Sequence, residues 1–182
     1  MRRLAACVLL LLGSVALSAT VVLPVEFREL VTTSQVIVHG HVTDTRSAYV
    51  DRRSSIQTFV TIAVDDYMKG DLGDHVTFFV PGGQIGPYKT VFIGAPEFHE
   101  GDEVVLFLRR NGSGVPFVAG LSQGAFRVLP DGSGQRVVTT PVVMAAGAND
   151  RQPVVRGDAA RRPLPLDDFR SAVRQVLAGT RQ

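Results

Sequence analysis

A serine within a glycine pair is the first feature of this chain that could do chemistry. Residues 120–124 read GLSQG, a match to the G-x-S-x-G pattern that presents a nucleophilic serine in many hydrolases. That chemistry needs a helix directly after Ser122, and then an acid and a histidine further along the chain. The following residues alternate like a strand, and the last histidine, His99, precedes the serine. We therefore expect a turn between two strands here and no catalytic serine.

The histidines decide whether a metal site can be expected. HEGDE at residues 99–103 is a near match to the zinc-protease pattern H-E-x-x-H, but it lacks the second histidine, and its glycine and aspartate favour a turn. His39 and His41 are two residues apart on a predicted strand, so both imidazoles could reach one ion, with His75 or an acidic side chain as a third ligand. Zinc sites need three or four ligands. We therefore expect His39 and His41 to be solvated on an outer strand face, with metal binding as the alternative.

A glycine-rich loop, PGGQIGPYKTVFIGAPEF at residues 81–98, is the strongest candidate for a contact surface. Its spacing fits neither phosphate-binding loop, and no helix follows it. Its irregular mixture of apolar and aromatic residues is unusual for an idle connection, and loops often carry binding sites. We expect a binding surface at Gln84, Tyr88, Phe92 and Phe98, unless the aromatic rings fold inward.

The N-terminal segment indicates export. Arg2 and Arg3 precede a short apolar run, and small residues follow up to Ala19. This is the layout of a secretory signal peptide, and the run is shorter than the roughly 20 residues that a membrane span needs. Residues 1–19 are therefore predicted as a signal peptide, and the mature protein is predicted to be secreted or periplasmic, with no membrane span.

Charge and cysteine content exclude further classes of function. Without Arg2 and Arg3 the chain has 17 basic and 17 acidic residues, so nucleic acid is not an expected partner. The only cysteine, Cys7, lies in the predicted signal, so the mature chain forms no disulfide and its stability must come from its core. No catalytic set is complete, and we predict neither enzyme activity nor a cofactor.

The elements that position these residues are mainly strands. Alternation and turn residues predict strands within 34–45, 56–68, 75–83, 104–108, 115–120, 124–130 and 135–140. Val104–Leu108 is apolar on both faces and is therefore predicted to be central. A short helix is predicted over Leu23–Ser34 and an amphipathic helix over 163–179, with a flexible loop rich in Pro, Gly and Ala over 141–162. We expect one mainly β domain over 20–140, an antiparallel barrel or sandwich that carries the N-terminal helix, followed by the C-terminal helix.

Three stretches of the chain resemble a known family. LVTTSQVIVHGHVTDT, VDDYMKGDLGDHVTFFV and FHEGDEVVLFL, between about Leu30 and Arg110, are similar to netrin-like modules and tissue metalloprotease inhibitors, and to uncharacterised secreted bacterial domains. The resemblance implies a small barrel of the oligonucleotide/oligosaccharide-binding (OB) type that makes contacts outside the cell. Those inhibitors chelate the zinc of their target with an N-terminal cysteine, and no residue here can take that role. Protease inhibition is therefore not implied.

These expectations combine into one predicted function and two alternatives. We expect a non-catalytic binding or interaction module of the cell envelope, with an extracytoplasmic protein or glycan as its partner. One alternative is a metal-binding or metal-dependent protein that uses His39 and His41. The other is a structural envelope component that packs with a partner through its C-terminal helix.

Overall fold

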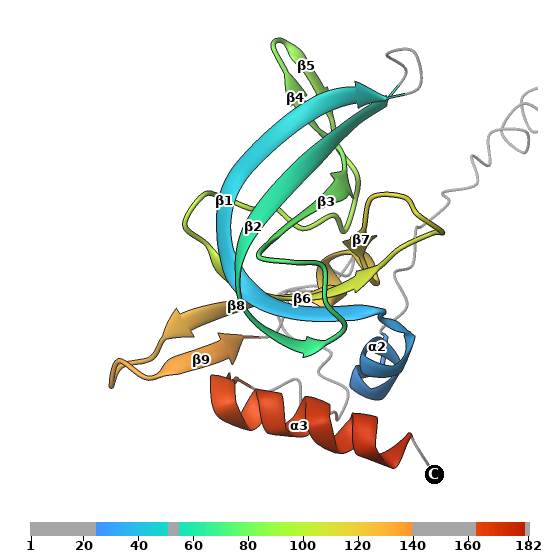
Figure 1. The fold of residues 1–182 in the computed structure, drawn as a ribbon. Coiled ribbons are helices and arrows are strands. Elements are labelled where there is room, and N and C mark those ends of the chain that lie inside the picture. The colour runs from blue at the N-terminus through green and yellow to red at the C-terminus, as the bar shows by residue number, and fades with distance from the viewer. Residues whose placement is uncertain (1–24, 51–54, 140–162, 181–182) are drawn as a thin grey trace, which may run out of the picture.

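The chain folds mainly into β-strands, with one helix near each end of its described part (Figure 1). A computed structural model describes residues 25–50, 55–139 and 163–180; the predicted signal peptide and the predicted loop over 141–162 lie outside these residues. The helices are α2 (Phe27–Thr33) and α3 (Leu166–Gly179). The strands are β1 (Val36–Val50), β2 (Ser55–Lys69), β3 (His75–Pro81), β4 (Gly83–Ile85), β5 (Tyr88–Thr90), β6 (Glu103–Arg109), β7 (Phe117–Val118), β8 (Ala125–Pro130), β9 (Arg136–Thr139) and β10 (Leu164–Pro165). The predicted mainly β class with a helix near each end is confirmed.

Five strands pair in a ring, and three more extend the sheet. β1, β2, β3, β7 and β6 pair in that order, and β6 pairs again with β1. β8, β9 and β10 continue from β6 in the same sheet, and β3 pairs with β7 in parallel through Phe79 and Phe117. The sheet is therefore large and mixed rather than a clean antiparallel barrel.

β1 and β2 form a long, strongly bent hairpin. Their register shifts at three places, and each shift is a bulge or irregularity that increases bending. At one of them Asp66 lies opposite His39 and Val64 lies opposite Gly40, which leaves Asp65 as an extra residue. Gly40 is required at this bulge, because a Cβ atom there would overlap the carbonyl oxygen of Ala63.

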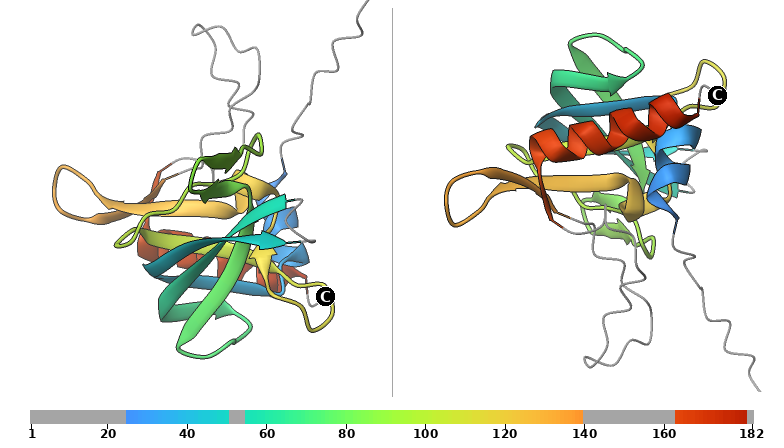
Figure 2. Two further views of the ribbon diagram at one scale, coloured as in Figure 1. Left: turned by 90° about the horizontal axis from the view of Figure 1, so that it is seen from above. Right: turned by 90° about the horizontal axis from the view of Figure 1, so that it is seen from below.

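The central strand β6 separates two cores, as its apolar sequence predicts. Val104, Leu106 and Leu108 are buried against the inner faces of β1, β2 and β3. Val105 and Phe107 are buried on the opposite side, where they contact the two helices. α3 crosses beneath the sheet and closes this second core (Figure 2). The apolar stripe of α3 is therefore used within the molecule.

Two element boundaries differ from the prediction. The C-terminal helix begins at Leu166 rather than at residue 163, because Leu164 and Pro165 form β10 against β9. Proline favours an extended conformation in the residue before it, so Leu164 is better suited to a strand. The predicted loop over 81–98 contains the β4–β5 hairpin, whose strands have only three residues each. Among the described residues, no helix combines the length and apolar character needed to cross a membrane.

Candidate functional site

The predicted binding loop forms an exposed apolar surface at one end of the molecule. The β4–β5 hairpin lies at the end of the β1–β2 hairpin that is far from α3 (Figure 1). Tyr88, Val91, Phe92 and Ile93 are 66%, 71%, 51% and 58% exposed. We call these four side chains the apolar segment. Gln84 and Tyr88 lie exposed on the hairpin and Phe92 lies exposed just beyond it, as the sequence predicts.

Phe98 does not belong to this surface. Its ring packs edge-on against Phe78, with ring centroids 5.3 Å apart, and it contacts the core between β1, β2 and β3. It is the one residue of the predicted binding surface that folds inward, and it holds the end of the loop against the sheet. Val91 and Ile93 belong to the exposed surface instead. The sequence prediction missed them because it was based mainly on aromatic residues.

Hydrogen bonds fix the hairpin to the sheet, so its exposed position is part of the fold. The Thr58 hydroxyl donates to the carbonyl oxygen of Gly82 (2.9 Å), and the N–H of Gln84 donates to the Ser47 hydroxyl oxygen (3.3 Å). Gly83 has a φ of 143° and lies directly over both hydroxyls. A Cβ atom at Gly83 would come within 2.6 Å of each of them. Only glycine allows the hairpin to approach this closely.

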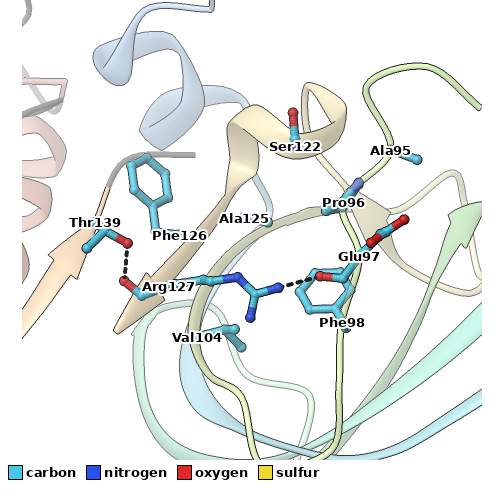
Figure 3. A pocket seen from close by; sticks show the side chains of 10 residues that line it. All are labelled: Ala95, Pro96, Glu97, Phe98, Val104, Ser122, Ala125, Phe126, Arg127 and Thr139. Carbon is cyan, nitrogen blue, oxygen red and sulfur yellow. Dashed lines mark hydrogen bonds between the residues drawn. The ribbon is translucent and has the colours of Figure 1, made fainter. Parts of the chain in front are cut away.

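A pocket of about 350 Å³ lies next to the apolar segment along the chain (Figure 3). Its walls come from the stretch after Gly94, from the turn at Ser122 and from β8, and its lining residues are Ala95, Pro96, Glu97, Phe98, Val104, Ser122, Ala125, Phe126, Arg127 and Thr139. Two backbone hydrogen bonds connect the pocket wall to the apolar segment and to the residue after it: Ala95 N–H donates to Phe92 O, and Ser122 N–H donates to the carbonyl oxygen of Gly94.

The guanidinium in the pocket wall is already paired. Arg127 donates to the carbonyl oxygen of Glu97 (2.6 Å) and lies 2.5 Å from the Asp102 carboxylate. Partial burial acts to raise the pKa of Asp102, but the hydrogen bonds from Arg127 and from the His99 N–H, together with the positive charge, outweigh it. The pKa of Asp102 therefore lies below its ordinary value. The Asp102 N–H also donates to the carbonyl oxygen of His99, which closes a turn. The predicted turn in HEGDE is therefore confirmed.

Ser122 does not lie in the strand–turn–helix arrangement that the G-x-S-x-G pattern requires. It lies in a 3₁₀ turn, Leu121–Gly124, between β7 and β8, so a strand rather than a helix follows it. Its side chain points away from the Arg127 guanidinium (Figure 3). Among residues 25–50, 55–139 and 163–180, no histidine forms a hydrogen bond with it. The predicted turn between strands is confirmed.

The two strand histidines form a polar junction under α3. His39 is 1% exposed, which corrects the expectation that it is solvated. Its Nε2 lies 2.8 Å from Glu103 Oε1, and its Nδ1 lies 3.5 Å from Arg170 Nη2 on α3. Asp65, the extra residue of the bulge, reaches His41 Nδ1 at 2.9 Å. The sequence could not reveal this junction, because α3 covers His39 only in the folded chain.

The junction is built from ion pairs and hydrogen bonds. Arg170 also lies 3.2 Å from Asp66 and 2.9 Å from Asp167, and Arg136 lies 3.1 Å from Glu103. Within the described part of the chain, no group of three or more His, Cys, Asp or Glu side chains is arranged to hold a metal ion. His75 lies across the sheet from His41, with Ala63 between them, and does not reach the junction. The geometry favours a structural role for His39 and His41.

No protein-family model, curated protein or solved structure matches this chain. The resemblance to netrin-like modules therefore stays a prediction.

Proposed function

We propose that the chain is an exported, non-catalytic binding module that docks onto a component of the cell envelope through the apolar segment. One observation carries the proposal: four large apolar side chains, within six consecutive residues, are each more than half exposed. Contiguous exposed apolar surface marks sites of interaction on soluble proteins. The hydrogen bonds of Gln84 N–H to Ser47 and of Thr58 to Gly82 O hold the hairpin in place, which favours a preformed contact surface over a loose loop.

The chemistry of the segment favours an apolar partner surface over a glycan. Sugar hydroxyl groups need hydrogen-bond partners when water is removed from them. Within residues 88–93, the four apolar side chains outnumber the two polar ones, Lys89 and Thr90. The setting of Ser122 and the paired nitrogens of His39 support a binding role over a catalytic one. The alternative of docking through the C-terminal helix is less favoured, because Leu166, Phe169 and Val173 of α3 are buried in the chain's own core.

Site-specific crosslinking tests this proposal. A benzophenone amino acid is placed at position 92 in one variant and at position 129 in another, since both residues are 51% exposed while Phe92 follows β5 and Leu129 lies on β8. We expect light-dependent adducts with an envelope component at position 92 and none at position 129. Equal labelling at both positions, or no adduct at positions 88, 91, 92 and 93, would contradict the proposal.

A further inference from the structure

We propose that the component contacted by the apolar segment is the phospholipid surface of a membrane, into which Tyr88, Val91, Phe92 and Ile93 insert at headgroup depth. This inference rests on the proposed function and names the class of partner. Tyrosine and phenylalanine suit that depth, because their rings are apolar and the tyrosine hydroxyl stays in contact with water. Peripheral proteins bind membranes by burying apolar side chains at the boundary between headgroups and acyl chains.

The directions of the side chains favour a partner that surrounds the segment. Val91 and Phe92 are consecutive residues just after β5, and the side chains of consecutive residues diverge from the backbone in both helical and extended conformations. Ile93 follows within a turn that is closed by the hydrogen bond from Ala95 N–H to Phe92 O. All three side chains are nevertheless more than half exposed. A flat protein surface would cover one side of this segment, whereas a lipid layer covers every side.

The charges around the segment also complement an anionic membrane. No aspartate or glutamate lies between Asp74 and Glu97, and Lys89 lies within the segment. The described part of the neighbouring hairpin, at residues 45–50 and 55–59, contains Arg46 and no acidic residue. Carboxylates gather instead at the junction near α3, where Asp65, Asp66 and Glu103 are found. The described residues at this end therefore carry positive charge and no carboxylate, which favours approach to anionic headgroups, and each cation strengthens binding.

The fold presents the segment in a fixed orientation. The β4–β5 hairpin lies at the end of the described molecule that is far from α3, so neither described helix stands between it and a flat surface at that end (Figure 1). The hydrogen bonds with Ser47 and Thr58 hold the start of the hairpin against β1 and β2. Little ordering is then needed on binding, which favours association.

Vesicle flotation tests the inference. The exported protein is mixed with vesicles of phosphatidylcholine alone or of phosphatidylcholine with phosphatidylglycerol, and mass spectrometry verifies that all variants have the same N-terminus. We expect the wild-type chain to float with both, and more strongly with the anionic vesicles. Val91→Ser, Phe92→Ser and Ile93→Ser combined should lower the partition coefficient at least about tenfold, since each loses exposed apolar area. Lys89→Gln should lower it about fivefold on anionic vesicles only.

Matched controls separate this result from general stickiness. Val115 and Leu129 are also exposed, at 45% and 51%, so Val115→Ser with Leu129→Ser should float like the wild type. Circular dichroism should show the same fold and melting temperature for every variant. A wild-type chain that stays unbound to both vesicles overturns the inference, as does a triple variant that still floats. If position 92 then crosslinks to a protein, or light scattering shows a dimer that the triple variant abolishes, the lipid assignment fails while docking through the apolar segment stands.

Discussion

His39 is the one buried ionisable side chain among the described residues, and its partners explain why the fold accepts it. A neutral imidazole can donate one hydrogen bond and accept another. Here Nε2 can donate to Glu103, and Nδ1 can accept from Arg170. Through these two contacts a single side chain on β1 joins the central strand to the C-terminal helix. The alternation of β1 correctly predicts that His39 and His41 share a face, but the local sequence does not show that a distant helix covers it.

Removing this side chain should destabilise the protein. We expect His39→Ala to lower the free energy of unfolding by about 2–4 kcal/mol, because Glu103 and Arg170 lose a buried partner and a cavity forms. His75→Ala should cost less than about 0.5 kcal/mol, since His75 is exposed at the start of β3. Urea unfolding at neutral pH measures both values. Equal costs would show that the junction contributes nothing.

Asp102 should make stability depend on acidity. Its pKa in the folded chain lies below the ordinary value of 3.8, so its carboxylate stabilises the fold above that pH. The contribution is lost as the pH falls through the lowered pKa. We expect Asp102→Asn to be less stable than the wild type by about 1 kcal/mol at pH 7, and this gap should narrow as the pH falls below 3.8. Thermal unfolding across this range measures the gap, and a gap that does not change with pH would contradict the account.

Among the secondary-structure elements, the β4–β5 hairpin matters most for the proposed site. The sequence predicts the larger strands because their apolar residues alternate, and both helices because their apolar residues recur every three or four positions. It does not predict β4 and β5, because three-residue strands give too short a pattern. The sequence left open that aromatic rings of the loop fold inward, but it could not show that Phe98 is the one that does, since that ring packs on Phe78 of β3. The approximate location of the site was predictable from its composition, and its exact membership was not.

The close approach of the hairpin to the sheet can be tested at Gly83. A Cβ atom there would come too near the Thr58 and Ser47 hydroxyls, and φ is unfavourable for other residues. We expect Gly83→Ala to cost about 2 kcal/mol and to speed hydrogen exchange of the hairpin amides. Gly132→Ala is the control, because a Cβ atom at that position would have open space around it. Similar exchange rates in both variants would argue against a fixed hairpin.

α3 should be required for the second core. Phe169 is 1% exposed, and its ring lies 5.5 Å from Phe27 and 5.2 Å from Phe126 between centroids. Phe169→Ala should lower the free energy of unfolding by about 3–5 kcal/mol. Arg174→Ala, on the exposed face of the same helix, should change it by less than about 0.5 kcal/mol. A mild effect of Phe169→Ala in denaturant unfolding would show that α3 is dispensable.

Over the whole molecule, the described chain has two unlike ends. The helical end contains the buried junction and the core closed by α3. At the hairpin end, the described residues expose apolar side chains and include no aspartate or glutamate. Composition alone predicts neither end, because basic and acidic residues balance once Arg2 and Arg3 are set aside. The separation arises from topology, which brings the β4–β5 hairpin to the far end of β1 and β2.

Fractionation of cells that export the protein tests the central claim, that the apolar segment docks the chain onto the envelope. The wild type and the Val91→Ser, Phe92→Ser, Ile93→Ser triple variant are expressed at equal levels, and the membrane pellet is compared with the exported soluble fraction. We predict that the wild type is recovered mainly in the pellet and the folded triple variant mainly in the soluble fraction. Recovery of both proteins in the same fraction would contradict the account.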